Sequence, residues 1–319
     1  VLFCSTAAVA IVLLRGGYMV QEQVLQIATL SAFTTYAVGI FEPIQMTAAN
    51  IAEFISLQAS IERVTDLMDE QPQIQDTPEV IEKYGDAFHP KRENWEPIRG
   101  EIEFRDVTFR YPDGGENVLE HFSLHIPQGT TVAIVGETGA GKSTLINLAC
   151  RFFEPTEGQI LIDGVDVTKL GEHQRAAYIG RVFQDPMTGT AATMQIEENL
   201  ALAARRGKHR TLRIGITKAE REQYRELLKT LDLGLEDRLT ARVGLLSGGQ
   251  RQALTLLMAT MNNPKLLLLD EHTAALDPKT ALKVLTLSAR IVEENHLTTM
   301  MITHNMKDAI KYGNRLIDR

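Results

Sequence analysis

Residues 136–144 read Gly136-Glu137-Thr138-Gly139-Ala140-Gly141-Lys142-Ser143-Thr144 and fit the pattern G-x-x-x-x-G-K-S. The apolar stretch Thr131–Val135 before them predicts a strand, and Leu145–Ala149 after them predicts a helix, which is the context that identifies a phosphate-binding loop. In such a loop, backbone N–H groups wrap the phosphates and the helix N-terminus adds a positive dipole. Lys142 supplies a charge for the β and γ phosphates, and the Ser143 hydroxyl can ligate Mg²⁺. We therefore predict that residues 136–144 bind ATP with Mg²⁺.

Two acids follow an apolar run further along the chain. Leu266–Leu269 predicts a buried strand, and Asp270 and Glu271 come directly after it. Because ligands of open α/β folds bind at the carboxyl ends of strands, both carboxylates would emerge at that edge. Asp270 is suited to hold Mg²⁺ through water, and Glu271 to polarise an attacking water. Taken alone, acids at a strand end are also often helix caps.

Between these motifs lies Leu246-Ser247-Gly248-Gly249-Gln250, which opens a predicted helix over Arg251–Met261. Small residues at a helix N-terminus can receive phosphate, although in isolation this pentapeptide would be a plain capping turn. In this order, the motifs of residues 102–318 resemble the nucleotide-binding domain of ABC transporters. The resemblance implies an α/β P-loop NTPase fold, with a mixed sheet, flanking helices and a helical subdomain at about residues 190–262.

The resemblance also implies roles for residues outside these motifs. Tyr111 matches the aromatic residue that stacks on adenine, and Gln184 matches the glutamine that senses Mg²⁺ and water and faces the membrane domain. Residues 275–277 match a loop that crosses to a partner subunit, and His304 matches the switch histidine that contacts the γ-phosphate. His272 departs from the family, which commonly has proline there, and we expect no catalytic role for it.

The predicted site follows from the motifs and the resemblance together. The predicted ATP-binding residues are Tyr111, Gly136, Glu137, Thr138, Gly139, Ala140, Gly141, Lys142, Ser143, Thr144, Ser247, Gly248, Gly249 and Gln250. The predicted catalytic residues are Glu271, His304 and Gln184, and the predicted metal ligands are Ser143, Gln184 and Asp270. The family's mechanism implies a head-to-tail dimer with a second cassette, identical or different, in which each ATP lies between the glycine loop of one copy and the Ser247 motif of the other.

The N-terminal part contains apolar stretches of the kind found in membrane segments. Residues 1–14 are almost wholly apolar, and the apolar stretch 24–49 is long enough for a crossing, although Glu42 and Pro43 interrupt it. A buried helical hairpin is the alternative for the second stretch, and a signal peptide is a weaker one for the first. The spacing of apolar residues over 51–68 predicts an amphipathic helix. We predict a partial transmembrane domain over 1–70, a proline-interrupted linker over 71–99 and an ABC nucleotide-binding domain over 100–319.

This arrangement implies a cell (inner) membrane location, with the ATPase domain in the cytoplasm and a membrane-spanning transporter domain as partner. Two parts of the chain nevertheless resemble different ABC subfamilies. Residues up to about Leu170 resemble an exporter half-transporter, whereas Tyr178–Met187 and Leu254–Asn262 look like a stand-alone importer-type ATPase subunit. Our hypothesis is that the chain joins two ABC subfamilies near Leu170, which leaves coupling to its own membrane segment open. Because the chain starts at Val1, we also expect it to be a fragment.

Composition narrows the possible functions. A net charge of −8 argues against broad nucleic-acid binding, which needs a basic face. Two distant cysteines, Cys4 and Cys150, make a disulfide framework or a cysteine metal site improbable. ATP-driven export is the leading prediction. The alternatives are an importer ATPase subunit that acts with separate permease chains and an ABC ATPase without a transport role.

Overall fold

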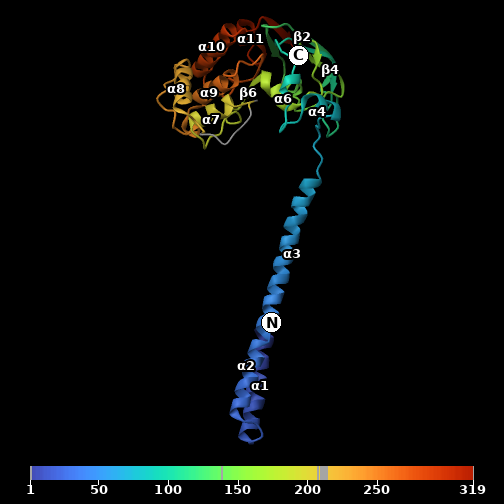
Figure 1. Cartoon of the computed structure of the whole chain (residues 1–319), viewed down its shortest axis with the longest axis vertical. Helices are drawn as coiled ribbons and strands as arrows, with labels where there is room; N and C mark the ends of the chain where they lie inside the picture. The colour runs from blue at the N-terminus through green and yellow to red at the C-terminus, as the bar shows by residue number, and fades with distance from the viewer. Residues whose placement is uncertain (1, 138, 207, 209–214, 319) are drawn as a thin grey trace. The chain divides into compact units, whose positions relative to one another are not determined.

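The computed structural model of this chain describes residues 2–137, 139–206, 208 and 215–318, with residues 2–5, 42, 45 and 318 described by their backbone alone. Thr138, one of the predicted ATP-binding residues, lies outside the described residues. The chain divides into two compact units, Val1–Gln73 and Ile74–Arg319 (Figure 1). The other predicted site residues all belong to the second unit.

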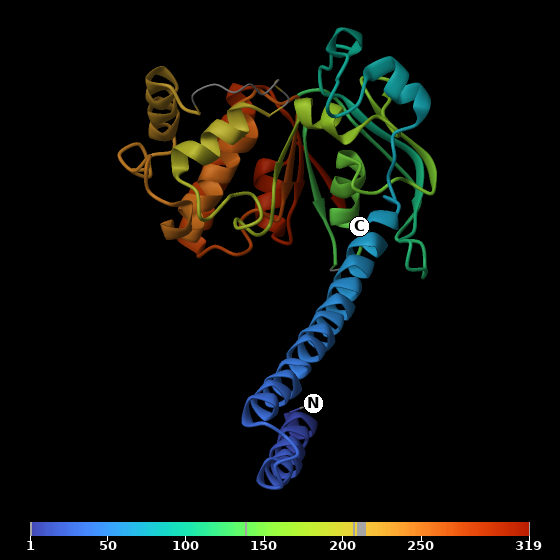
Figure 2. The same cartoon turned by 60° about the horizontal axis from the view of Figure 1, so that its bottom comes forward.

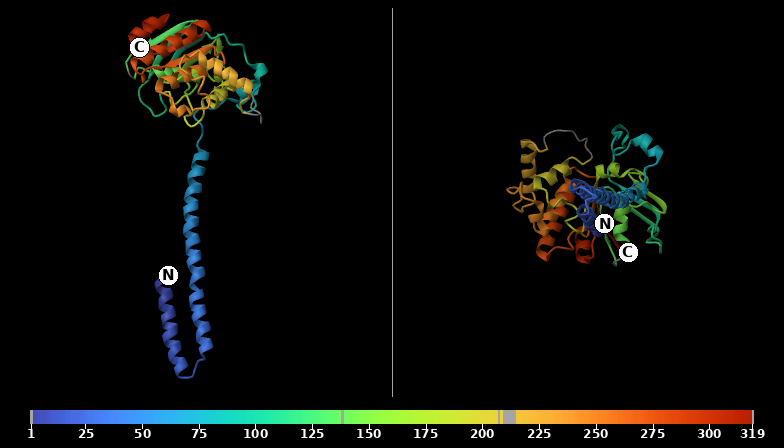
Figure 3. Two further views of the ribbon diagram at one scale, coloured as in Figure 1. Left: turned by 90° about the vertical axis from the view of Figure 1, so that its left-hand side faces the viewer. Right: turned by 90° about the horizontal axis from the view of Figure 1, so that it is seen from below.

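The described part of the N-terminal unit is helical and consists of α1 (Leu2–Gln21), α2 (Ile27–Gly39) and α3 (Phe41–Asp69), with α1 beside α2 (Figure 3). A glycine allows the two helices to approach closely, since a Cβ atom at Gly16 would lie 2.2 Å from Leu30 Cδ1. Ile40 keeps helical dihedral angles, φ −71° and ψ −25°, so that α3 follows α2 almost without a break. The unit is therefore a helical hairpin with one long arm.

These helices divide the predicted membrane segment. Residues 24–49 fall in the turn after α1, in α2 and in the first part of α3. Within the described residues, no helix is both long enough and apolar enough to cross a membrane. The membrane segment predicted over 1–70 is not confirmed.

The predicted linker contains regular structure. It holds α4 (Pro78–Tyr84) and a short 3₁₀ helix, η1 (Arg92–Asn94). Pro78 does not break α4 because it occupies the first turn, where its missing N–H has no helical partner to lose. Asp76 forms an ion pair with Arg151, whose side chain is only 1% exposed. Residues 74–99 are thus attached to the cassette rather than extended away from it.

An antiparallel sheet forms one side of the second unit. Its strands are β1 (Ile102–Phe109), β2 (Leu119–Ile126), β4 (Glu157–Ile162) and β5 (Val165–Asp166), hydrogen-bonded in the order β2-β1-β4-β5 (Figure 2). β4 pairs antiparallel with β1, Ile162 opposite Ile102. β4 therefore lies in an antiparallel sheet, although its sequence is as apolar as that of a buried parallel strand. Its apolar residues Ile160 and Ile162 face a buried core, which made it similar to a parallel strand in sequence.

A separate, five-stranded parallel sheet lies at the centre. Its strands are β3 (Thr131–Val135), β6 (Ile179–Val182), β7 (Leu266–Asp270), β8 (Thr298–Ile302) and β9 (Arg315–Asp318), in the order β6-β7-β8-β3-β9. β3, β7 and β8 are buried along their whole length, as expected for parallel strands covered on both faces. The described part of the fold therefore holds two sheets, one antiparallel and one parallel, flanked by helices as expected for the predicted α/β P-loop NTPase fold.

Two apolar cores cover the two faces of the parallel sheet. One contains Leu266 and Leu268 with residues of β1, β2, β4 and α5 (Lys142–Cys150), and so fills the space between the two sheets. The other contains Leu267 and Leu269 and packs under the helical region. The remaining described helices are α6 (Glu172–Tyr178), α7 (Ile196–Ala204), α8 (Lys218–Lys229), η2 (Val243–Leu245), α9 (Gly248–Thr260), α10 (Pro278–Glu294) and α11 (Met306–Tyr312). The predicted helical subdomain at 190–262 corresponds in the structure to α7, α8, η2 and α9.

Candidate nucleotide-binding and hydrolysis site

Four neighbouring strands of the parallel sheet end at predicted site residues. Residues 136–144 follow β3, Gln184 lies two residues after β6, Asp270 and Glu271 stand at the end of β7, and His304 lies two residues after β8. Parallel pairing of β6 with β7, β7 with β8 and β8 with β3 brings their carboxyl ends to one edge. This edge is where open α/β sheets bind ligands.

The glycine loop has the backbone that phosphate binding needs. Gly136, Gly139 and Gly141 have φ values of 143°, 91° and 77°, in a region that other residues rarely adopt. The N-cap of α5 is Gly141, which has no side chain to cap the first turn, so the N–H groups of that turn are suited to bind an anion. Lys142 is 5% exposed, and its Nζ donates to the carbonyl oxygens of Gly136 at 2.8 Å and Glu137 at 2.6 Å. A buried cation therefore lies within the curve of the loop.

Ser143 and Asp270 bring together two oxygen donors. Ser143 Oγ donates to Asp270 Oδ1 at 3.1 Å, across the boundary between α5 and β7. Hydroxyl and carboxylate oxygens suit Mg²⁺, which usually takes one or two protein ligands and completes its shell with substrate phosphates and water. Among the residues that the structure describes, no group of three or more His, Cys, Asp or Glu side chains could hold a metal alone. The pair fits a magnesium site that a nucleotide completes.

The predicted catalytic residues meet at Glu271. Gln184 Nε2 donates to Glu271 Oε2 at 3.2 Å, and His304 Nε2 lies 2.6 Å from Glu271 Oε1. Glu271 has a φ of 43°, which is uncommon for a residue with a side chain and typical of functional sites. Its side chain is 12% exposed, so its orientation is held while one edge remains open to solvent. The carboxylate is thus fixed by side chains from both adjoining strands.

Tyr111 lies on the α5 side of the loop. Its hydroxyl is 3.0 Å from Thr144 Oγ1, and its ring meets those of Phe109 and Phe153 edge-on, with centroids 5.0 and 5.2 Å away. This contact places an aromatic ring next to the first turn of α5, near the glycine loop. It does not by itself test adenine stacking.

The pentapeptide at 246–250 stands apart from the glycine loop. Ser247 caps α9, its Oγ accepting from Gln250 N at 3.3 Å while Gln250 Oε1 accepts from Ser247 N at 3.2 Å. A Cβ at Gly249 would lie 1.9 Å from Thr280 Cγ2, so this glycine permits close packing on α10. In the described part of the chain, no hydrogen bond joins residues 247–250 to residues 136–144.

Sequence reasoning missed one residue of this site. Arg181 on β6 forms an ion pair with Asp270, NH2 to Oδ2 at 3.1 Å, and also donates to Asn147 Oδ1 on α5 at 2.9 Å. The available signal was an arginine within the short strand Ile179–Val182, because a charged residue in a buried strand needs a partner. His272, in contrast, is fully buried against Ser288, and burial lowers its pKa to about 4. It is neutral near pH 7 and does not face the site residues.

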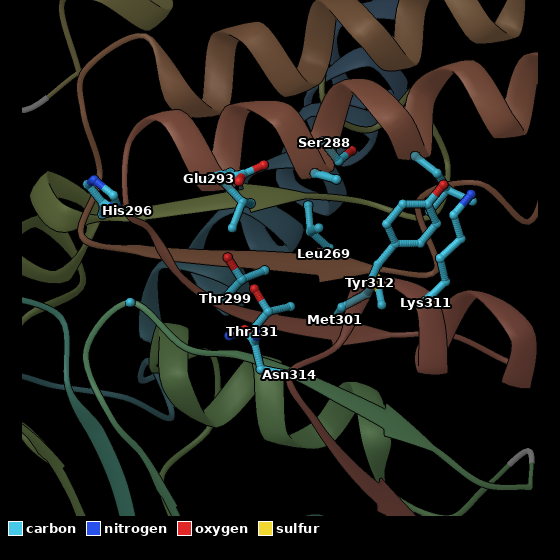
Figure 4. Close-up of a pocket in the computed structure, with 14 residues that line it drawn as sticks. Thr131, Leu269, Ser288, Glu293, His296, Thr299, Met301, Lys311, Tyr312 and Asn314 are labelled. Carbon is cyan, nitrogen blue, oxygen red and sulfur yellow. Dashed lines mark hydrogen bonds between the residues drawn. The ribbon is translucent and has the colours of Figure 1, made fainter.

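A separate cavity of about 340 Å³ lies between α10, α11 and the sheet (Figure 4). Thr131 and Thr299, at the amino ends of their strands, line it with Ser288, His296 and Tyr312. None of the predicted site residues that the structure describes lines this cavity. It is therefore distinct from the edge that carries the nucleotide motifs.

Comparison with known proteins places the chain among ABC proteins. The family model described as ABC transporter matches residues 119–274. The tyrosine transport ATP-binding protein of Clostridioides difficile (strain R20291) is 44% identical over 211 residues, which is 66% of this chain and 84% of that protein.

Longer transporters match almost the whole chain. The ABC multidrug transporter mdr2 of Aspergillus fumigatus is 32% identical over 318 residues, 99% of this chain but 37% of that protein. The beta-(1→2)glucan export ATP-binding/permease protein NdvA of Brucella suis biovar 1 is 30% identical over 304 residues, 95% of this chain and 47% of that protein. The chain thus spans less than half the length of these two proteins. Together with the motifs at the strand ends, these matches show that the chain belongs to the ABC transporter family and carries its ATP-hydrolysing cassette.

Proposed function

We propose that the chain binds MgATP at residues 136–144 and hydrolyses it to power the export of a solute, as part of an exporter-type half-transporter. One observation carries this proposal: Gln184, Glu271 and His304 meet at the edge of the sheet that also holds the Ser143–Asp270 pair. The long relative named as a glucan export ATP-binding/permease protein supports the direction of transport.

Each predicted site residue has its own role in ATP binding or hydrolysis in this proposal. Lys142 and the N–H groups of α5 hold the β and γ phosphates, and Ser143 with Asp270 holds Mg²⁺, which offsets phosphate charge when bound. Glu271 polarises the attacking water, while Gln184 and His304 keep its carboxylate oriented. His304 is 46% exposed, which leaves its ring able to contact the γ-phosphate. Tyr111 offers a face to adenine.

A second cassette completes each site in this proposal. Ser247 and Gly248 are exposed, at the uncovered N-terminus of α9, and in the described residues they have no hydrogen bond to the glycine loop of their own chain. A head-to-tail dimer would present this terminus to the ATP on the partner's loop. The specific ATPase rate should therefore rise with protein concentration and then level off. A rate strictly proportional to protein down to dilute monomer contradicts the dimer, and a Glu271→Gln preparation measures contaminating activity.

The N-terminal unit supports a membrane location in this proposal. Its exposed apolar side chains include Ile11 at 65%, Phe33 at 58% and Phe54 at 71%, more than a free surface usually presents. We propose that it packs with a membrane-spanning transporter domain in the cell (inner) membrane, with the cassette in the cytoplasm. The full chain should float with lipid vesicles, and Ile11→Asp with Phe33→Asp should abolish flotation. Leu245→Asp, at an exposed apolar residue of the cassette, is the matched control, and equal loss in the control would argue against the proposal.

A second candidate is an importer ATPase subunit that acts with separate permease chains. The 44% identity to a tyrosine transport ATP-binding protein, over 84% of that protein, favours it. The same contrast motivates the hypothesis that two ABC subfamilies join near Leu170. Residues 100–319 that remain soluble without detergent and co-purify with a separate permease would support the importer, whereas solute-stimulated ATP turnover in a membrane-complete protein would support the exporter. A rate of ATP hydrolysis that rises when nucleic acid is added would instead support an ABC ATPase without a transport role.

A further inference from the structure

We propose that Arg181 is a positioning residue for the magnesium site. By binding Oδ2 of Asp270, it orients the carboxylate so that Oδ1 is the oxygen that faces Mg²⁺. The proposal rests on the role of Asp270 in the proposed function. It goes beyond that role because it assigns a new residue, which is not among the predicted site residues, to the geometry of the site.

The two oxygens of Asp270 have different partners. Arg181 NH2 donates to Oδ2 at 3.1 Å, and Ser143 Oγ donates to Oδ1 at 3.1 Å. A hydroxyl can donate its hydrogen to a carboxylate and still present its lone pairs to a cation. Arg181 therefore holds the oxygen that the site does not use, and Oδ1 remains with Ser143 on the phosphate side.

Arg181 is itself held rigidly. Its NH1 donates to Asn147 Oδ1 at 2.9 Å, and its guanidinium lies between two rings, 4.6 Å from the centroid of Phe183 and 5.3 Å from that of Phe152. Its side chain is 13% exposed and that of Asp270 is 10% exposed. The planar fork binds these two acceptors through two different nitrogens, a geometry that the single ammonium nitrogen of a lysine does not reproduce. Arg181 thus ties the end of β7 to α5, the two elements that supply Asp270 and Ser143.

Arg181 also contacts a cavity beside β6, the strand that pairs with the strand of Asp270. Arg181 lies on β6, and Phe183 and Gln184 follow the end of that strand. Arg181 lines this cavity of about 810 Å³ together with Phe183 and residues of α7 and α9. One side chain therefore spans the distance between this cavity and Asp270. Outer partners of metal ligands commonly set metal affinity, because they fix the ligand's orientation.

A positioning role and a simple counter-charge predict opposite effects. If Arg181 orients Asp270, its loss should weaken Mg²⁺ binding by roughly 10-fold to 100-fold, the range typical of outer-shell changes. If it only neutralises Asp270, its loss should tighten Mg²⁺ binding, because the full negative charge becomes available. Arg181→Lys separates the two further, since it keeps the charge but replaces the planar two-nitrogen fork to Asp270 and Asn147 with a single ammonium nitrogen.

The test measures binding rather than turnover. The affinity of the full chain for a non-hydrolysable ATP analogue is determined by calorimetry with EDTA and then over a Mg²⁺ titration. Arg181→Met should leave the affinity in EDTA within about twofold, because the loop is untouched, and shift the Mg²⁺ midpoint upward by roughly 10-fold or more. Arg181→Lys should also shift it upward. Arg105→Met, which removes an exposed arginine paired with Glu103, should change neither value.

The outcomes separate the possible failures. A wild-type chain without any Mg²⁺ effect overturns the proposed function at Asp270. If Mg²⁺ does strengthen analogue binding to the wild-type chain, two results overturn the positioning role alone. One is that Arg181→Met leaves the Mg²⁺ midpoint unchanged or lowers it. The other is that Arg181→Lys keeps the wild-type midpoint. Should the Arg181 variants fail to fold, Asn147→Ala decides, because it keeps the Asp270 pair and removes the second anchor. It should give a smaller upward shift, and no shift overturns the proposal.

Discussion

His304 Nε2 lies 2.6 Å from Glu271 Oε1, so that the ends of the neighbouring strands β8 and β7 are joined by a contact between two predicted catalytic side chains. The backbone reinforces this contact, since Glu271 N–H donates to Ile302 O on β8 at 3.1 Å. Gln184 approaches the other carboxylate oxygen from β6. The carboxylate is therefore oriented before any substrate binds, which is the arrangement that water activation needs.

Glu271→Gln should separate binding from hydrolysis. The amide keeps the shape of the side chain but cannot accept a proton, so turnover should fall by about 10²-fold to 10⁴-fold. The affinity for ATP should stay within about twofold, since residues 136–144 are unchanged. Phosphate release and calorimetric titration with ATP measure the two quantities. Loss of both together would indicate that Glu271 acts on binding instead.

His304→Ala should lower turnover by about 10²-fold, the loss typical of removing one group that stabilises the reacting phosphate. His125→Ala is a matched control, because His125 Nε2 also lies 2.9 Å from a glutamate oxygen, that of Glu101, but on the antiparallel sheet. Steady-state phosphate release at saturating ATP compares the two variants. Equal losses in both would count against a specific role for His304.

The residues that the sequence placed well are those whose roles depend on local order. A strand, a glycine loop and a helix follow one another at 131–149, and Asp270 and Glu271 end an apolar run, so one short segment suffices for each prediction. The order β6-β7-β8-β3, which brings Gln184 and His304 to Glu271, depends on pairing between distant segments. No local pattern specifies that order, and the roles of Gln184 and His304 were predicted only from the family resemblance.

The misses have physical causes too. Ile160 and Ile162 on β4 are as buried as residues of a parallel strand, so the apolar pattern could not tell an antiparallel strand from a parallel one. Arg181 was overlooked because its partner Asp270 lies 89 residues away in sequence. The ordered segment after Gln73 was predicted as a linker from its prolines, whereas the contact that holds it, Asp76 with Arg151, is again a distant pair.

That pair makes the segment important for stability. Arg151 is 1% exposed and pairs with both Asp76 and Glu154. Asp76→Asn should therefore lower the free energy of unfolding by about 2 kcal/mol, a typical value for a hydrogen bond to a charged group. Urea unfolding of the full chain measures it. Asp113→Asn, at an exposed residue, is the control, and equal stability of both variants would mean that residues 74–99 add nothing to the cassette.

The ion pair between Arg221 and Glu197, in the helical region, predicts that the stability of the fold decreases at acid pH. Arg221 binds Glu197 through two hydrogen bonds of 2.6 and 2.7 Å, and these bonds lower the pKa of the Glu197 carboxyl below its ordinary value of 4.5. The stabilisation is present above pH 4.5 and is lost as the pH falls through the lower, folded-state pKa. Glu197→Gln should remove this part of the pH dependence and lower stability at pH 7. Thermal unfolding from pH 3 to 7 measures it, and Glu222→Gln, in the more exposed pair with Arg225, should keep the wild-type slope.

The two halves of the composite ATP site can be tested by mixing two inactive chains. Lys142→Ala damages the glycine loop, and Gly248→Asp places a negative charge where the partner's γ-phosphate would approach. Gly248 is well suited to this change, because a Cβ there would meet only Leu276 Cδ2, at an ordinary 3.4 Å, and an acid in the first turn of α9 favours the helix. Each variant alone should have little activity, since both sites of its dimer carry the defect.

A mixed dimer behaves differently in a head-to-tail arrangement. One of its sites then combines the intact loop of the Gly248→Asp chain with the intact Ser247 motif of the Lys142→Ala chain, while the other site carries both defects. Equal amounts of the two variants should therefore regain up to about a quarter of the wild-type rate, because random pairing makes half of the dimers mixed and each has one working site. Phosphate release from the mixture, beside each variant alone at the same total concentration, measures the gain. Activity no higher than the average of the two variants would mean that the loop and the Ser247 motif do not meet across chains.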